Sequence, residues 1–213
     1  MLIAAVLFDL DGVLIDSEGI YTEFWGEMDR RYPTGVPDFT RQIKGSTLPV
    51  ILARYFPDED VQRQVRVALE RQEREMRYRL FPGALDLLEG LRGQGVRTAI
   101  VTSSNRKKMD NLFDQLPDLA RLAGLVVTDE DVTESKPSPQ GYLLAAERLG
   151  VRPEDCAVVE DSLAGLRAAR ASGATVIGLT TTNRPDAVRP LADITLGSVA
   201  EIGGVINFHN GKP

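Results

Sequence analysis

From about residue 80, hydrophobic and polar positions follow a helical period in some segments and form short apolar runs in others. The segment 82–95 places apolar side chains at helical spacing, with a proline before it and glycines at its end. Strand-like apolar runs then occur at 96–104, 122–128, 155–160 and 174–180, and further helical patterns at 137–150 and 161–173. This alternation predicts a Rossmann-like α/β fold, a parallel sheet with helices on both faces, whose ligands lie beyond the carboxyl ends of the strands.

The segment from about residue 17 to residue 79 breaks this rhythm, because it is helical and poor in strand patterns. Towards its end, glutamate is followed four residues later by arginine at Glu70–Arg74, Glu73–Arg77 and Glu75–Arg79. Such spacing is typical of a solvated helix face with weak ion pairs. We expect a small helical insertion, hinged near Ser17 and near 79–82. Residues 1–16 and 80–213 would then form the core domain and residues 17–79 a second domain.

Composition narrows the classes of function. The 213 residues are 43% hydrophobic, enough for a sizeable core, and the net charge of −6 gives no electrostatic reason to bind nucleic acid or an anionic membrane. Cys156 is the only cysteine, so no internal disulfide can form, and we expect it in the core. His209, the only histidine, lies in a polar tail, which argues against sites built on several histidines. No apolar run suits a membrane span and the amino terminus makes a poor signal peptide, so the expected location is the cytoplasm.

Polar side chains stand where the expected strands end. The apolar run 2–8 leads directly into Asp9 and Asp11, "VTSSN" ends a second strand, and "VVEDS" ends a later one. A fourth stretch, "ESKPSP", precedes a helix. Each stretch alone is ordinary, since paired acids in a turn are more often solvated or ion-binding than catalytic, and Ser, Asn and acids commonly begin helices. Their order on successive strand ends predicts that they converge on one site.

The charges at this edge of the sheet need to be balanced. Up to four negative charges would meet there, from Asp9, Asp11, Glu160 and Asp161. Lys136 offsets one of them, and a divalent cation would offset two more, since Mg²⁺ typically binds a few carboxylates, a carbonyl and waters. The hydroxyl and amides after the second strand can hold an anion at a helix start. Carboxylates, a cation, a lysine and an anion site together indicate phosphoryl transfer.

Four stretches carry a resemblance to a known family. "FDLDGVLIDSE", "VTSSN", "SKPSP" and "VVEDSLAGLRAA" resemble, in order and approximate spacing, the four motifs of the haloacid dehalogenase-like phosphohydrolase superfamily. The resemblance spans nearly the whole chain; the first motif and the "ED" form of the fourth are specific, and the other two are weaker alone. The insertion at 17–79 looks like the family's small helical cap. The nearest branch is that of β-phosphoglucomutase-like and phosphoglycolate phosphatase-like proteins.

The resemblance assigns catalytic roles to matched residues. Asp9 would be the nucleophile that forms an aspartyl-phosphate, and Asp11 would protonate the leaving alcohol and then deprotonate the attacking water. Asp11 also indicates phosphate esters, because the dehalogenase and phosphonatase branches lack an aspartate at this second position. Thr102 and the Ser103 amide would hold phosphoryl oxygens. Lys136 would neutralise charge on the nucleophile and the phosphate.

The resemblance also implies binding residues. The implied ligands of Mg²⁺ are Asp9, Asp11 through its backbone carbonyl, Asp161, and Glu160 as a ligand or as a partner of one. The implied substrate-binding residues of the core are Gly12, where the chain would turn sharply, Ser103, Ser104 and Asn105. Those of the cap are Glu18, Tyr21, Lys44 and Thr47, of which Tyr21 could equally serve cap packing.

A phosphomutase would need a cap that grips a sugar bisphosphate at both ends. In β-phosphoglucomutase-like proteins a histidine follows the first motif, and Tyr21 stands at the aligned position here. The stretch "IKGSTLPVIL" resembles the specificity loop of the cap and retains Lys44, but an apolar residue near Leu48 replaces the expected arginine. Both departures favour hydrolysis, although Arg77 or Arg79 could still contact a distal phosphate.

The expected function is that of a Mg²⁺-dependent phosphatase of small phosphorylated metabolites, such as sugar or polyol phosphates. A phosphosugar mutase is the alternative within the family. A catalytically silent phosphometabolite-binding protein is the alternative of another class, and the Asp9–Asp11 pair argues against it, since binding alone needs neither nucleophile nor acid. The expected partner is a small phosphorylated metabolite, without nucleic acid or membrane, and the expected assembly is a monomer or weak dimer.

Overall fold

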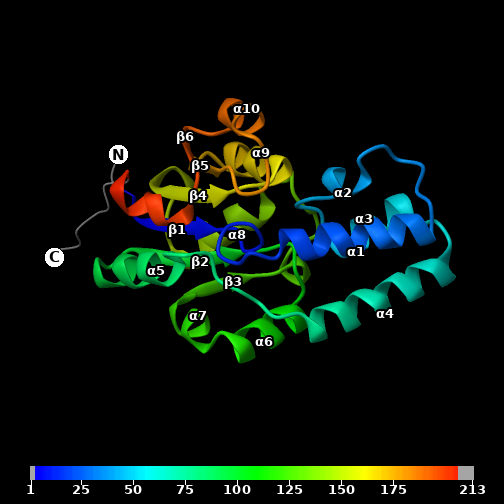
Figure 1. The fold of residues 1–213 in the computed structure, drawn as a ribbon. Coiled ribbons are helices and arrows are strands. Elements are labelled where there is room, and N and C mark those ends of the chain that lie inside the picture. The colour runs from blue at the N-terminus through cyan, green and yellow to red at the C-terminus, as the bar shows by residue number, and fades with distance from the viewer. Residues whose placement is uncertain (1–2, 206–213) are drawn as a thin grey trace.

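A six-stranded parallel sheet forms the centre of the protein in the computed structural model, which describes residues 3–205 (Figure 1). The strands lie side by side in the order β3-β2-β1-β4-β5-β6. Their bounds are β1 Ala5–Phe8, β2 Arg97–Val101, β3 Leu125–Val127, β4 Cys156–Glu160, β5 Thr175–Leu179 and β6 Ile194–Leu196. The predicted parallel α/β fold class is confirmed, while β6 is a short strand that the apolar pattern did not predict.

Helices cover both faces of the sheet, because successive strand residues point to opposite sides. On β1, Val6 and Phe8 belong to one buried cluster and Leu7 to another. Helices on the first face are α5 Ala84–Gly93, α6 Arg106–Gln115, α7 Pro117–Leu122 and the 3₁₀ helix η4 Val199–Gly204. Helices on the second face are α8 Gln140–Leu149, α9 Leu163–Ser172 and α10 Pro185–Val188. The remaining 3₁₀ turns are η1 Asp129–Asp131, η2 Pro153–Asp155 and η3 Arg189–Leu191.

Four helices between β1 and α5 extend beyond one end of the sheet (Figure 1). They are α1 Glu18–Arg31, α2 Phe39–Gln42, α3 Leu48–Tyr55 and α4 Glu59–Glu75. Their buried side chains form a separate cluster in which the Trp25 ring contacts the rings of Phe24, Phe39 and Phe56. A core of its own supports the expectation that this insert is a distinct structural unit.

The two chain segments that join the insert to the sheet run beside each other. The Asp16 amide donates to the Arg79 carbonyl at 2.8 Å, and the Phe81 amide donates to the Leu14 carbonyl at 2.9 Å. These backbone bonds lie next to the two expected hinges. The insert therefore leaves and rejoins the core at one place, close to the carboxyl end of β1.

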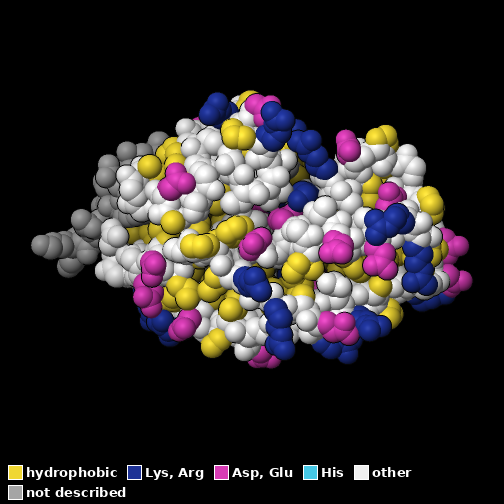
Figure 2. All heavy atoms as spheres, in the orientation of Figure 1, with side chains coloured by type: hydrophobic (Ala, Val, Ile, Leu, Met, Phe, Trp, Pro, Cys, Tyr) yellow, Lys and Arg dark blue, Asp and Glu magenta, His cyan; other side chains and the backbone are white. Residues whose placement is uncertain are grey.

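Helix α4 does not carry the ion pairs expected along it. The helix ends at Glu75, so Arg77 and Arg79 follow it and do not continue its face. Within the described residues, Glu70 pairs with Lys107 of α6 at 2.7 Å rather than with the arginine one turn later. Glu70 thus ties α4 to the core, while Arg71 and Glu75 form an exposed ion pair along the helix at 3.0 Å. Figure 2 shows acidic and basic side chains interspersed on the visible face of the insert.

The composition led to expectations for Cys156, for His209 and for a membrane span. Cys156 is fully buried in β4, as expected for a small core residue. His209 lies outside the described residues. No helix in the described part of the chain has the length and apolar character to cross a membrane.

Candidate active site

The site is built at the carboxyl ends of the three central strands. Asp9 directly follows β1, Thr102 directly follows β2, and Glu160 is the last residue of β4. Phe8 pairs with Val159 across the two middle strands, and the Asp9 amide donates to the Val159 carbonyl at 2.9 Å. This register places the carboxylates of Asp9 and Glu160 on one edge of the sheet, as the strand-end pattern predicted.

Lys136 reaches this edge from the loop before α8. Its Nζ donates to Asp9 Oδ1 at 2.5 Å and to Glu160 Oε1 at 2.6 Å. The lysine side chain is only 8% exposed. Burial acts to lower the pKa of Lys136, but the Asp9 and Glu160 carboxylates outweigh it and hold the pKa well above its usual value. The charge-balancing partner predicted for the acids is therefore in place.

One lysine does not balance the buried acids. Desolvation, opposed by Lys136 and reinforced by Glu160, raises the pKa of Asp9 to about 7. Desolvation, with the nearby Glu160 and Asp9 carboxylates, raises the pKa of Asp161 well above its usual value. Both Asp161 side-chain oxygens are buried, and no hydrogen bond of normal geometry reaches either of them from the described residues, although the Thr182 hydroxyl is close enough to lower the pKa of Asp161 slightly. Such an arrangement is costly unless a further cation satisfies it.

A divalent cation fits this place. Asp9, Glu160 and Asp161 each offer a carboxylate oxygen, and these three atoms lie within 4.8 Å of one another. All three residues are buried, and oxygen ligands of this kind suit Mg²⁺. The unpartnered oxygens of Asp161 are the observation that favours an ion here over a purely structural acidic cluster.

Glu160 is held by donors on both of its oxygens. Oε1 accepts from Lys136 and from the Tyr142 hydroxyl at 3.0 Å, and Oε2 accepts from the Asp161 and Ser162 amides, both at 2.9 Å, and from the Ser162 hydroxyl. A Cβ at Gly165 would lie 1.6 Å from Oε1, so only glycine leaves room for this carboxylate. Because both of its oxygens already accept hydrogen bonds, Glu160 is better suited to hold Lys136 and Ser162 in place than to be a main ligand of a metal ion.

The loop after β5 completes the surroundings of Asp161. The Asn183 side-chain amide donates to the Asp161 carbonyl at 2.9 Å, and the Thr181 hydroxyl donates to the Gly12 carbonyl at 2.5 Å. Gly12 has a φ of +84°, and a Cβ there would lie 2.1 Å from Asp161 Oδ2. Gly12 thus makes room for a carboxylate. The sequence reasoning missed this threonine-rich loop, although its position at a strand end could have indicated it.

Asp11 has a cation of its own. Lys108 Nζ lies 2.7 Å from Asp11 Oδ1 and 2.6 Å from Oδ2. The Ser104 hydroxyl donates to Oδ2 at 3.2 Å, and the Ser17 hydroxyl donates to Oδ1. The sequence reasoning assigned no role to Lys108. Its location in the first turn of α6 was a possible signal, since a cation is unfavourable at a helix amino terminus.

The segment after β2 forms a polar turn that begins α6. Asn105 caps this helix by accepting from the Lys108 amide at 2.8 Å, as the sequence predicted. The Thr102 hydroxyl accepts from the Ser104 amide at 3.1 Å. The Ser103 hydroxyl donates to the Gly45 carbonyl of the insert at 2.9 Å. The turn is thus fixed at both ends and faces the insert.

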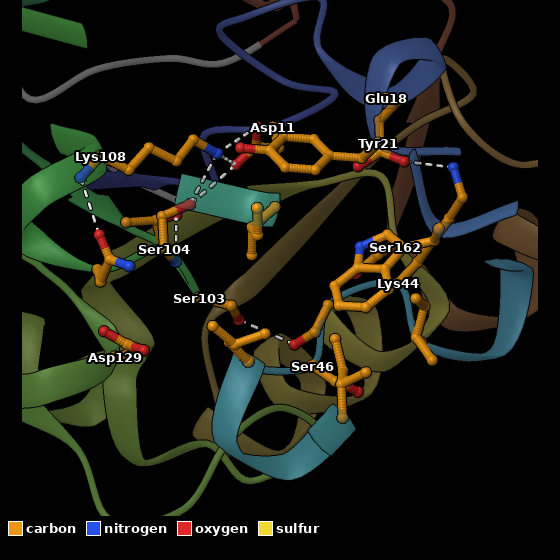
Figure 3. A pocket seen from close by; sticks show the side chains of 18 of the residues that line it. Asp11, Glu18, Tyr21, Lys44, Ser46, Ser103, Ser104, Lys108, Asp129 and Ser162 are labelled. Atoms are coloured by element: carbon orange, nitrogen blue, oxygen red, sulfur yellow. Dashed lines mark hydrogen bonds and ion pairs between the residues drawn. The ribbon is translucent and has the colours of Figure 1, made fainter. Parts of the chain in front are cut away.

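We call the carboxyl edge of the sheet, with the residues that follow β1, β2 and β4, the rim. A cavity of ≈ 120 Å³ lies between the rim and the insert (Figure 3). Of the predicted site residues, those that line it are Asp9, Asp11, Glu18, Tyr21, Lys44, Thr102, Ser103, Ser104 and Asn105. The insert contributes an apolar wall made of Trp25, Ile43, Leu48, Ile51 and Leu69. Thr47 lines a smaller neighbouring pocket with Lys136, while Gly12 lies against Asp161.

The polar residues of the insert are paired inside this cavity. Lys44 forms an ion pair with Glu18 (Figure 3). The Tyr21 hydroxyl donates to Glu73 Oε1 at 3.0 Å. Desolvation, reinforced by the nearby acids Asp11 and Glu73, raises the pKa of Tyr21 well above its usual value, so this residue stays a neutral donor. Tyr21 therefore lines the cavity, as a substrate-binding residue would, and is also held by Glu73 of α4, as a packing residue of the cap would be.

Comparisons with known proteins agree with this geometry. The pattern that defines the haloacid dehalogenase-like hydrolases matches residues 3–173. A validoxylamine A 7'-phosphate phosphatase from Streptomyces hygroscopicus subsp. limoneus is 32% identical over 204 residues, which cover 92% of this chain and 94% of that protein. A β-phosphoglucomutase from Mycobacterium bovis is 29% identical, covering 94% and 91%. The crystal structure of CbbY from Rhodobacter sphaeroides in complex with phosphate superposes with a TM-score of 0.75 at 26% identity, covering 95% and 97%.

Proposed function

Because this chain belongs to the haloacid dehalogenase-like hydrolase family and is a phosphatase of that family, we propose that it is a Mg²⁺-dependent hydrolase of small metabolites that carry a single phosphate. One observation carries the proposal. The carboxylate of Asp9 stands at the cavity floor, bonded to Lys136 and beside the unpartnered carboxylate of Asp161. This arrangement presents a nucleophile together with the charge balance that an incoming phosphate requires.

The residues that would hold Mg²⁺ are Asp9 and Asp161 through side-chain oxygens and Asp11 through its backbone carbonyl. Glu160 would keep Asp161 and Lys136 in place. When bound, the ion would supply positive charge against the nucleophile and the phosphate and so lower their mutual repulsion.

The chain's own residues account for the two half-reactions. An Asp9 oxygen attacks phosphorus as the bond between phosphorus and the leaving oxygen breaks, and the phosphoryl group passes to Asp9. Asp11 gives a proton to the leaving oxygen and in the second step takes one from the water that attacks phosphorus, so that the bond between phosphorus and Asp9 breaks, inorganic phosphate leaves and the Asp9 carboxylate is restored. Thr102 and the Ser103 amide would hold phosphoryl oxygens, and Lys136 would offset the charge on Asp9 and the phosphate.

The cavity supports hydrolysis over mutase chemistry. A mutase must hold a second phosphate far from Asp9. Among the described residues that line the cavity, the cations are Lys44 and Lys108, and each is bound to a carboxylate of the site. The Leu48 side chain belongs to the apolar wall, and neither Arg77 nor Arg79 lines the cavity. We infer a substrate with one phosphate and an alcohol part that has both hydroxyl groups and an apolar face, as a sugar or polyol phosphate has.

We further propose that residues 1–16 and 80–213 form the catalytic core and residues 17–79 a cap that selects the substrate. The separate aromatic cluster of the insert and its two adjacent connections support this division. The activity named for the Streptomyces relative supports a phosphorylated, sugar-like substrate class.

A phosphate-release screen tests the function. Purified protein is incubated with sugar, polyol and hydroxy-acid monophosphates and with sugar bisphosphates, with and without Mg²⁺. We expect Mg²⁺-dependent release that is faster for monophosphates. Incubation with hexose 1-phosphate plus the corresponding bisphosphate tests the alternative, because hexose 6-phosphate formed without net phosphate release would establish a mutase. If the wild type released no phosphate from any ester and Asp9→Asn behaved in the same way, the protein would be a catalytically silent binding protein and not a phosphatase.

A further inference from the structure

Lys108 is a buried cation in the cavity that the motifs of the chain do not explain. Its side chain is only 2% exposed. The ammonium group contacts both Asp11 oxygens, the Ser104 hydroxyl at 2.9 Å, and the face of the Tyr21 ring at 4.5 Å from its centroid. Figure 3 shows Lys108, Ser104 and Asp11 pointing towards one another. A lysine this deeply buried is stabilised only by such partners.

The neighbouring cations show that this placement is particular to Lys108. Helix α6 begins with three consecutive cations, where the helix dipole disfavours positive charge. Arg106 pairs with Asp131 on the surface, and Lys107 pairs with Glu70 of α4. Both side chains are more than half exposed, at 64% and 70%. Lys108 alone of the three points into the cavity.

The contacts of Asp11 show what this lysine controls. The Asp11 carboxylate receives hydrogen bonds from Ser17, Ser104 and Lys108, and only Lys108 binds both of its oxygens. Each hydroxyl holds one oxygen, whereas the ammonium group holds both, and hydrogen bonds from a charged donor are stronger than those from a neutral hydroxyl. Lys108 therefore makes the strongest contacts that hold the Asp11 carboxylate, and it also holds the Ser104 hydroxyl that supports one of the two oxygens.

We propose that Lys108 is a positioning residue for proton transfer at the leaving oxygen. It acts through Asp11, by fixing which way that carboxyl group faces, and it joins Asp11 to the insert through the Tyr21 ring. The proposal rests on the phosphatase function proposed above. It concerns the proton transfers made by Asp11 and not the nucleophile, because Asp9 and the acids around it make their bonds without Lys108.

The dependence on the leaving group separates this role from a structural one. An alkyl phosphate releases an alkoxide-like oxygen that needs a proton, so its hydrolysis depends on a well-placed general acid. The p-nitrophenyl ester releases a stable phenolate that needs little help. Asp11 acts again as a base in the second step, which is the same for both esters, so the comparison is made on the first turnover, when the alcohol leaves. In that step, loss of Lys108 should slow the alkyl ester selectively, whereas a disturbed fold or a lost phosphate contact slows both esters.

The experiment compares Lys108→Met with Lys107→Met, which removes the adjacent exposed lysine. We expect Lys108→Met to lower the first-turnover rate of alcohol release from an alkyl phosphate about 10- to 100-fold, and the first-turnover release of p-nitrophenolate less than about threefold. Lys107→Met should match the wild type on both esters. If Lys108→Met does not fold, as judged by its Tm, Lys108→Gln is measured in the same way, because its neutral and shorter side chain cannot hold both Asp11 oxygens and the same selective loss is expected.

A double-variant cycle completes the test. In the Asp11→Asn background, Lys108→Met should have no further effect on the alkyl ester, since the residue through which it acts is already lost. Equal losses of the first-turnover rate for both esters, or a full effect that persists in Asp11→Asn, would overturn the proposal. If the wild type hydrolyses neither ester, it is the phosphatase function that fails. If the wild type hydrolyses both and Lys108→Met shows no selectivity, only the role of Lys108 fails.

Discussion

The rim of the sheet and the insert build opposite sides of one cavity in different ways. On the rim, Glu160 has donors on both oxygens, and Lys136 bridges two carboxylates from adjacent strands. On the insert, the polar groups are tied in single pairs, Lys44 with Glu18 and Tyr21 with Glu73. Heavily tethered groups suit a fixed reaction, and lightly tethered groups suit the choice of the alcohol.

The backbone that carries the rim is also more firmly fixed than the backbone of the insert. The acids of the rim stand at the ends of fully buried strands, where the backbone register sets their spacing. The insert is held together by its own aromatic cluster and returns to the core at one place. Changes on the rim should therefore alter the chemical step, and changes on the insert should alter which substrate is used.

The largest effect is expected on the rim, at the nucleophile. Asp9→Asn removes the attacking carboxylate and should lower kcat by at least about 10⁴-fold for every substrate. Its Tm without metal should not fall, because burial already disfavours the charged form of Asp9. Phosphate release and thermal unfolding measure the two effects. If Asp9→Asn kept more than about a tenth of the activity, the rim would not supply the nucleophile.

A smaller effect is expected from Asp161, the acid with two unpartnered oxygens. Asp161→Asn keeps the shape but weakens the ion site, so turnover at limiting Mg²⁺ should fall about 100-fold and recover in part at high Mg²⁺. Asp186→Asn, a change at an exposed acid on α10, is the control. Chelation of divalent cations should abolish wild-type turnover. An unchanged Mg²⁺ dependence in Asp161→Asn would place the ion elsewhere.

On the insert, the expected effect is selective. Lys44→Met removes one member of the pair with Glu18 at the cavity wall. For a substrate found in the screen, KM should rise about tenfold, while kcat for p-nitrophenyl phosphate stays within about twofold. Arg54→Met, on the exposed side of α3, is the matched control. A uniform loss on all esters would instead show that Lys44 serves the reaction itself, and the division between rim and insert would fail.

The smallest effect concerns stability and Asp129, which lines the cavity outside the motifs. Desolvation and the adjacent Glu130 raise the pKa of Asp129 to about 7. The unfolded chain loses this proton near pH 4, so the folded state is progressively destabilised as pH rises towards 7. Asp129→Asn escapes this cost and should raise Tm by about 2–4 °C at about pH 8.

The change of this Tm gain with pH tests whether it comes from the buried Asp129 charge. The gain in Tm should shrink as the pH is lowered from about 7 to about 5, because the wild-type carboxyl group then stays protonated in the folded state. Asp110→Asn, at an exposed position on α6, controls for the loss of one negative charge. A gain that is the same at both ends of this range would show that burial of the Asp129 charge is not its cause.

The sequence predicted the sheet and the residues of its rim because both follow local rules. Apolar runs marked five strands, and the position of Asp9, Thr102 and Asp161 directly after strands indicated where they would converge. The strand β6 was missed because its three residues are only partly buried and its apolar run is too short to stand out. In the part of the chain that the structure describes, two of the ion pairs expected on α4 do not form because the helix ends at Glu75, and the third is replaced because Glu70 pairs with Lys107 of α6.

The contacts that the sequence could not provide join residues far apart in the chain. Lys108 meets Asp11 across 97 positions, and the Thr181 hydroxyl meets the Gly12 carbonyl across 169. The Tyr142 position showed a helical apolar period, but only the fold reveals that its hydroxyl binds Glu160. The insert was the least predictable part, because the pairing of its polar groups depends on how its helices pack.

Acid quenching during turnover shows whether Asp9 accepts the phosphoryl group. Wild-type protein is mixed with p-nitrophenyl phosphate and Mg²⁺, quenched in acid during turnover, and digested for peptide mass spectrometry. We predict one added phosphoryl group on the peptide that contains Asp9, absent in Asp9→Asn and absent without Mg²⁺. Steady phosphate release with no phosphoryl group on that peptide, and with Asp9→Asn still active, would contradict the account.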